Sequence, residues 1–251
     1  MTSAVMAAVL AATFVTAMIS GVFGMAGGLI LMGVLVWVTP VAVAMVLHGA
    51  IQIVSNGSRA AFLWKHISWR VIGRYLIGVV AAVAVLVFVA WRPNEPVVFL
   101  LLGITPMVVW LPKERFRLDA ERPVHAVVCG FLVQLLNTLA GVAGPLLDLF
   151  FVRTEMSRQA VVATKAATQV TAHAVKIAFW GAPIFLAGDA AAAFPSPWLF
   201  AALVPLSLAG TWLGGRILER MTDASFRQWT KWIVTAIGVV YLVRGVSGLI
   251  G

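Results

Sequence analysis

Long apolar runs are the feature that most constrains how this chain can fold. Several reach or approach the roughly 20 residues that a helix needs to cross a bilayer. The chain is 62% hydrophobic and 11% charged, whereas about 25% of the residues in soluble domains are charged. We therefore expect one integral, all-α membrane domain over residues 1–251. Its apolar runs lie at residues 4–19, 41–58, 71–90, 97–111 and 197–215.

The net charge of +9 does not indicate a nucleic-acid partner, because the basic residues gather in short connectors between apolar runs. Lys and Arg in such connectors mark the cytoplasmic side of a membrane protein. We expect basic connectors at 59–74, 113–122 and 216–231 to be cytoplasmic, and the connector at 181–197, with a single charge, to be outside. Both chain termini are then expected outside.

Two motifs recur in the same register. The sequence GMAGG at residues 24–28 is followed 117 positions later (141 − 24) by GVAGP at residues 141–145. We therefore expect a first repeat at 1–112, a cytoplasmic linker at 113–123 and a second repeat at 124–251. A polar stripe keeps the same offset, which pairs His48 with Lys165, Gln52 with Gln169, Asn56 with His173 and Arg59 with Lys176.

The connectors give corresponding helices of the two halves opposite directions. The helix from residue 41 must run toward the cytoplasm, whereas the helix at 157–180 must run outward. This inversion requires an odd number of crossings in each half, so we expect residues 4–38 and 124–152 each to form a hairpin of two half-helices. The predicted fold is two inverted-topology repeats, each a broken-helix hairpin plus three transmembrane helices.

The glycine motifs are the expected breaks in these hairpins, because glycine lets the backbone leave the helix and approach another group closely. The N-termini of half-helices that meet near the membrane centre offer free amides to an anion. The alternative is that the glycines only allow helices to pack closely. The candidate binding glycines are Gly24, Gly27, Gly28, Gly141 and Gly144.

Each polar stripe falls on one helical face, and polar groups within a bilayer are costly unless they face a partner or a wet cavity. We therefore expect the stripes to face the breaks. Asn137 and Thr138 precede the second break and either bind the anion or cap the helix. The stripe residues proposed to bind substrate are His48, Gln52, Asn56, Lys165, Gln169 and His173. The alternative for His48 and His173 is a core histidine that donates to a carbonyl, and the alternative for Lys165 is a side chain that extends toward the cytoplasmic surface.

Three further charged residues are candidates for the substrate pathway. Arg59 and Lys176 either line it or extend to the membrane surface. Asp148, an acid within a predicted hairpin, needs a partner such as Lys165 or Lys176. No metal site or cofactor is predicted, because the histidines lack nearby cysteines or paired carboxylates.

The sequence SGVFGMAGG at 20–28, its GVAG echo at 141–144, and SRQA at 157–160 leading to Lys165 and Gln169 resemble the sulfite exporter TauE/SafE family. The resemblance implies a bacterial inner-membrane protein that exports sulfite or an organosulfonate such as sulfoacetate. Pro145 stands where the resemblance leads us to expect a glycine or another small residue.

The expected function is a secondary transporter whose partners are a small anion and membrane lipid, with a homodimer left open. A passive anion channel would use the same polar stripes. A membrane enzyme with His48 and His173 as acid and base is the other alternative, although the sequence offers no convincing nucleophile or carboxylate pair.

Overall fold

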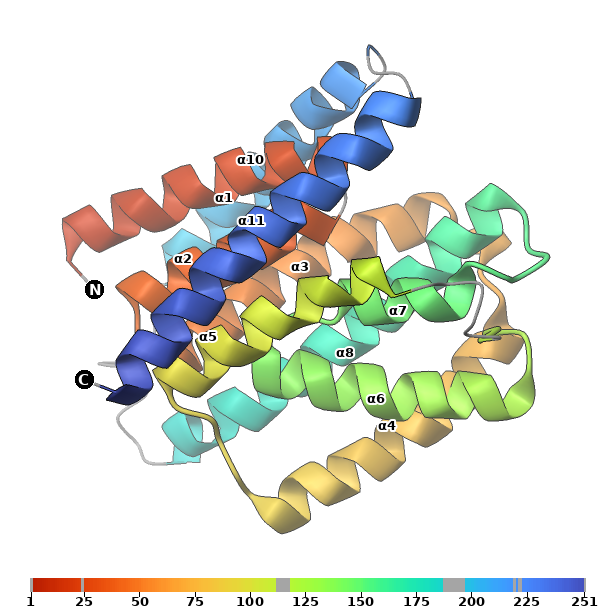
Figure 1. The fold of residues 1–251 in the computed structure, drawn as a ribbon, viewed down its shortest axis with the longest axis horizontal. Helices are drawn as coiled ribbons and strands as arrows, with labels where there is room; N and C mark the ends of the chain where they lie inside the picture. The colour runs from red at the N-terminus through yellow and green to blue at the C-terminus, as the bar shows by residue number, and fades with distance from the viewer. Residues whose placement is uncertain are drawn as a thin grey trace.

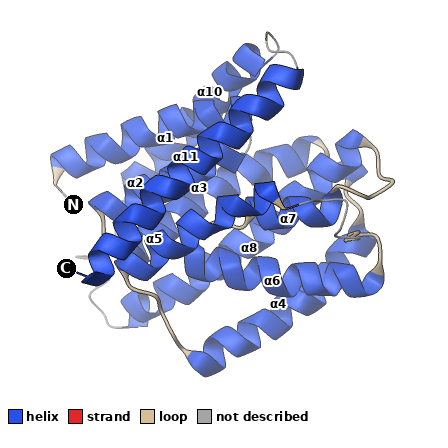
Figure 2. Ribbon diagram, in the orientation of Figure 1, coloured by secondary structure: helices blue, strands red, loops and turns tan. Residues whose placement is uncertain are grey.

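The computed structural model describes residues 2–23, 25–111, 118–186, 197–218, 220 and 223–250. All regular secondary structure in that part of the chain is helical (Figure 2). Gly24 and residues 113–117 of the predicted linker lie outside the described residues.

The helices fall into two sets of similar order. The first set consists of α1 (Ser3–Phe23), α2 (Met25–Val38), α3 (Val41–Phe62), η1 (Trp64–His66), α4 (Trp69–Val89), α5 (Glu95–Ile104) and η2 (Thr105–Trp110). The second set consists of α6 (Pro123–Ala140), α7 (Gly144–Phe151), α8 (Arg158–Leu186), α10 (Pro197–Leu218) and α11 (Asp223–Ile250).

Six helices among the described residues are long and apolar enough to cross a membrane, namely α1, α3, α4, α6, α10 and α11. This confirms the predicted all-helical, multi-pass membrane class. The 29-residue α8 is not one of the six, because it carries the polar residues of the second stripe. It packs against α3, α4 and α6, so that its polar side chains can face protein.

The two expected hairpins break where the glycines lie, but their first arms are longer than predicted. Helix α1 ends at Phe23 and α2 begins at Met25; α6 ends at Ala140 and α7 begins at Gly144. With 21 and 18 residues, α1 and α6 are full-length spans, so the prediction of two half-helices was wrong for these arms. Neither contains an internal proline, and an isolated glycine in each does not stop an otherwise apolar helix.

The helices pack in four close pairs: α1 with α10, α4 with α6, α3 with α8, and α5 with α11. Small residues let the first two pairs approach closely, as they commonly do in membranes. A Cβ added to Gly21 of α1 would lie 2.9 Å from the Cα of Gly214 of α10. A Cβ added to Gly130 of α6 would collide with the backbone of Tyr75 of α4.

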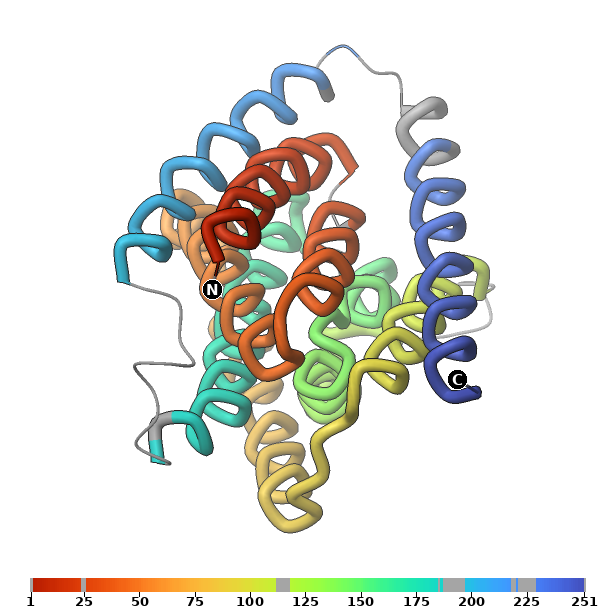
Figure 3. Tube along the Cα trace, turned by 90° about the vertical axis from the view of Figure 1, so that its left-hand side faces the viewer, coloured from red at the N-terminus to blue at the C-terminus, as the bar shows by residue number. Residues whose placement is uncertain are grey.

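Both ends of the chain lie at the same end of the bundle, although not next to each other. In Figures 1 and 3 both termini lie at one end of the bundle, while the connector between α3 and α4 lies at the opposite end in Figure 1. Helix α3 runs from left to right in Figure 1, and α8 runs from right to left beside it. Their shared interface is the centre of the molecule and carries both polar stripes.

Candidate functional site

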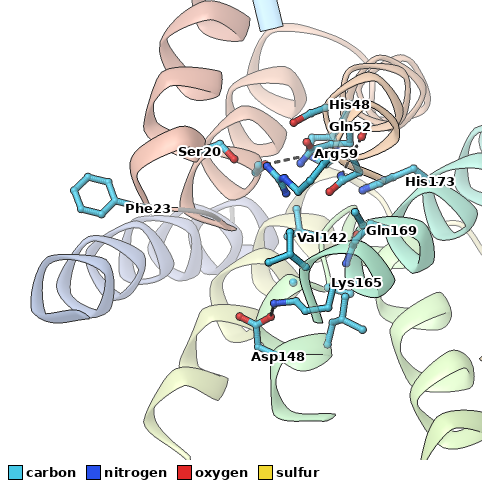
Figure 4. Close-up of a pocket in the computed structure, with 18 of the residues that line it drawn as sticks. Ser20, Phe23, His48, Gln52, Arg59, Val142, Asp148, Lys165, Gln169 and His173 are labelled. Carbon is cyan, nitrogen blue, oxygen red and sulfur yellow. Dashed lines mark hydrogen bonds and ion pairs between the residues drawn. The ribbon is translucent and has the colours of Figure 1, made fainter. Parts of the chain in front are cut away.

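A cavity of about 570 Å³ lies between α3, α8 and the second break. Figure 4 shows its polar side chains converging from α3 on one side and from α7 and α8 on the other. From α3 the wall receives His48, Gln52, Ser55, Asn56 and Arg59, and from α8 it receives Val162, Lys165, Ala166, Gln169 and His173. Val142, Ala143, Gly144, Leu147 and Asp148 form the wall at the second break, and Ser20, Phe23, Gly28, Val109, Thr230 and Lys231 complete it.

The two histidines form the deep, dry part of this wall. His48 is 0% exposed and His173 is 2% exposed, and their rings meet edge to face with centroids 5.5 Å apart. Residues far apart in the sequence therefore meet, because α3 and α8 run side by side. No group of three or more His, Cys, Asp or Glu that could hold a metal ion occurs among the described residues.

Lys176 lies behind the histidines and is also 0% exposed. Its Nζ lies 2.8 Å from His48 Nδ1 and donates to the Gly141 carbonyl at 2.8 Å. The other ring nitrogen of His48, Nε2, lies 3.0 Å from the Gly28 carbonyl. A carbonyl can only accept, so His48 carries its proton on Nε2, and Nδ1 of the neutral ring accepts from Lys176. A continuous hydrogen-bonded chain thus joins the two glycine motifs.

The carbonyl that Lys176 contacts is set by the backbone at the second break. Gly141 caps α6 with a φ of 83°, which is the left-handed region that glycine reaches most easily. The carboxyl end of a helix attracts a cation through its unpaired carbonyls and its dipole. The buried amino group of Lys176 therefore has two acceptors without a carboxylate partner.

The other part of the cavity is wetter and holds an ion pair between Lys165 and Asp148. Their side chains are 31% and 27% exposed, respectively. Figure 4 shows the ammonium of Lys165 directed at the carboxylate of Asp148. Asp148 does have the lysine partner that its position in the sequence required, and that partner is Lys165.

Positive charge predominates on the cavity wall. Arg59, Lys165 and Lys231 are lining cations, and Asp148 is the one carboxylate among the described lining residues. The Lys231 ammonium lies 3.7 Å from the centroid of the Trp110 ring, a cation–π contact that holds it at the wall. Such a wall attracts anions and repels cations.

Residues at the start of α7 line the same wall. Ala143 and Gly144, which lead into this helix, both line the cavity. Pro145 has no amide hydrogen, but its fixed φ suits the first turn of a helix, where that hydrogen would have no partner. The positive end of the α7 dipole therefore points toward the cavity.

Some of the predicted site residues lie away from the wall. Thr138 accepts a hydrogen bond from Gln134, its carbonyl accepts one from Trp180, and the buried amide of Asn137 finds no partner among the described residues. A Cβ on Gly27 would collide with the backbone of α1, which is the close-packing role considered for these glycines. Gly24 lies outside the described residues. The predicted residues that line the cavity are Gly28, His48, Gln52, Asn56, Arg59, Gly144, Asp148, Lys165, Gln169 and His173.

The residues of the site and its support that sequence reasoning missed include Ser55, Gln134, Lys231 and Trp180. Ser55 lies three positions after Gln52 on the face of the same stripe, so helical spacing could have found it. Gln134 precedes Thr138 by four residues and bonds to it, which the same spacing could have indicated. Lys231 and Trp180 gave no such signal, because their place depends on how α11 and α8 pack.

Comparison with known proteins gives one match. Neither the curated proteins nor the solved structures contain a protein that matches the chain. The family model described as "Sulfite exporter TauE/SafE" matches residues 9–241. This span includes both glycine motifs, both polar stripes and all the cavity-lining residues. The chain therefore belongs to the sulfite exporter TauE/SafE family.

Proposed function

We propose that this protein is a secondary transporter that exports a small sulfur-containing anion, sulfite or an organosulfonate, across a bacterial inner membrane. The observation that carries the proposal is the cavity wall, where three cations face one carboxylate. Membership of the family supports a sulfur-containing substrate, and the wall independently supports an anion.

The cavity has the size and the donors that such a ligand needs. At about 570 Å³ it is within the roughly 300–1,000 Å³ typical of small-molecule sites, so a small anion fits together with water. The amides of Gln52, Asn56 and Gln169 supply neutral donors beside the cations. A sulfonate or sulfite presents three oxygens on one sulfur, and such an anion accepts charge-assisted hydrogen bonds from several sides.

The two ends of the interface between α3 and α8 support alternating access. By the offset of 117 residues, Lys176 corresponds to Arg59 and His48 corresponds to Lys165. The His48–Lys176 end is closed by hydrogen bonds, whereas the Arg59–Lys165 end is part of the open cavity wall. Equivalent ends in unequal states are what an alternating transporter requires, since exchanging their states would move the opening to the other side.

The packing pairs agree with inverted repeats. If the halves are exchanged, the α1–α10 pair maps onto α6–α4, while α3–α8 and α5–α11 each map onto themselves. The basic connectors favour a cytoplasmic Arg59 end of the cavity and termini on the outside. An inside-negative membrane potential favours export of an anion from that side by about 2.3 kcal/mol per charge for each 100 mV.

Ligand binding to the purified protein tests the anion site. Thermal unfolding is measured with sulfite, sulfoacetate, sulfate and acetate for the wild type and for Lys165→Ala. We expect sulfite or sulfoacetate to raise the unfolding temperature of the wild type, and this shift to be much smaller in Lys165→Ala, which keeps Arg59 and Lys231 on the wall. Lys65→Ala is the matched control, because Lys65 is exposed in η1 and away from the cavity. An equal shift in all three proteins would contradict the assigned site.

Flux measurements separate the transporter from the passive channel. Proteoliposomes loaded with sulfite are assayed for efflux over a wide range of internal concentrations. A transporter that alternates between states saturates and shows accelerated exchange when the anion is also present outside. Efflux that stays proportional to concentration, without exchange, would instead establish a channel.

A further inference from the structure

The ion pair between Lys165 and Asp148 presents a problem for an anion site. Lys165 is the wall cation that lies beside the amides of α8, yet it already contacts a carboxylate. An anion that enters the cavity finds this ammonium neutralised. It must either avoid Lys165 or take the place of Asp148.

Exposure favours displacement of the carboxylate. The two side chains are partly exposed, at 31% and 27%, and ion pairs in contact with water are held weakly. The Asp148 side chain can turn to water at little cost, because it lies on the cavity wall. A free anion, in contrast, can contact Lys165 and the nearby Gln169 amide together, which gives it donors that the tethered carboxylate does not use.

We propose that the Asp148 carboxylate competes with the bound anion for the Lys165 ammonium. It pairs with Lys165 while the cavity is empty, and its charge sets which anions the cavity accepts. The inference rests on the proposed anion transport. With Asp148 ionised, one negative charge offsets part of the positive charge of Arg59, Lys165 and Lys231. The remaining positive charge suits a monoanion or a weakly held dianion. The Asp148 carboxylate keeps either anion from binding too tightly for release.

Two probe anions of the same shape and different charge test the proposal by calorimetry: sulfate, a dianion, and methanesulfonate, a monoanion. Asp148→Asn keeps the side-chain size and removes its charge. We expect affinity to rise about tenfold for sulfate and about threefold for methanesulfonate, because the energy gained scales with the charge of the ligand. Glu155→Gln is the control, because this exposed acid lies outside the cavity wall, and it should leave both affinities unchanged.

A double variant separates competition at Lys165 from a general effect of charge. In a Lys165→Ala background the carboxylate has no ammonium to occupy, so Asp148→Asn should then raise sulfate affinity by about twofold or less. An equal rise in sulfate affinity with and without Lys165 would overturn the proposal that Asp148 competes for Lys165. Should Asp148→Asn fail to fold, Asp148→Ser carries the same expectations.

The remaining outcomes are also decisive. Unchanged or weaker anion binding by Asp148→Asn, with wild-type binding intact, overturns the proposed competition and leaves the proposed transport function standing. Such a result would make Asp148 a residue that positions Lys165. No binding of sulfate, methanesulfonate or sulfite by the wild type would overturn both proposals together.

Discussion

Lys165 and Lys176 occupy the same helix, three turns apart, and the structure gives them opposite surroundings. Lys176 is fully buried and contacts a histidine nitrogen and a backbone carbonyl. Lys165 is partly exposed and contacts a carboxylate. The two lysines of this helix therefore differ in role. The buried lysine ties elements together through fixed backbone and ring partners, whereas the wet lysine has a charged partner that another anion can replace.

The comparison also shows why a lysine can be buried here without an acid. The Gly141 carbonyl ends α6 and carries the negative end of the helix dipole. The lone pair of His48 Nδ1 accepts a second hydrogen bond from the same amino group. Both acceptors lose their donor if Lys176 is shortened.

The largest effect is expected from Lys176→Ala. The substitution leaves a cavity and two buried acceptors without a donor, so we expect a loss of about 3 kcal/mol in the free energy of unfolding. Lys165→Ala should cost less than about 1 kcal/mol, because its ion pair is exposed to water. Unfolding in detergent, followed for both variants, provides the measurement. Equal losses would remove the distinction between the two lysines.

A smaller effect is expected from Gly141→Ala, which alters the carbonyl beneath Lys176. The left-handed backbone at φ 83° costs an alanine about 1–2 kcal/mol, and its Cβ would lie 2.6 Å from the Met32 sulfur. Gly73→Ala is the control, since a Cβ there meets nothing within 4 Å. We expect the unfolding temperature to fall for the first variant and to stay or rise slightly for the second. An unchanged temperature for Gly141→Ala would show that the second break adapts without cost.

The smallest effect is expected from Lys231→Gln, which removes a wall cation that makes no ion pair in the described structure. Anion affinity should fall only about threefold, because water and salt screen a charge at the wall. Isothermal titration with sulfite measures the change. Arg244→Gln removes a cation at the far end of α11 and should leave affinity unaltered. A loss greater than that of Lys165→Ala would move the centre of the binding site toward α11.

Much of the site could be predicted from the sequence, for a definable reason. Gln52, Gln169 and Lys165 recur at helical spacing and in one register, and helical periodicity determines which side chains share a face. The glycine motifs likewise marked both helix breaks. The length of α1 could not be predicted in this way, because the argument from crossings fixed where the hairpin returns but not how far its first arm extends.

Other features depended on distances between segments. The sequence offered Asp148 both Lys165 and Lys176 as partners, and only the tertiary structure, which brings Asp148 of α7 to Lys165 of α8, decided between them. The packing of α3 against α8 brought His48 and His173 together, although they are 125 positions apart (173 − 48). Lys231 entered the cavity because α11 folds back against η2 and α5.

The sequence by itself determined that this chain is a helical membrane protein with two matching polar stripes and two glycine breaks. Apolar run length and residue spacing are local properties, and a bilayer converts them directly into helices. The tertiary structure decided which charges became partners and which stayed open to an anion. That choice depends on the approach of helices that are distant in the chain, where a shift of a few ångströms determines whether a lysine meets a carboxylate, a carbonyl or water.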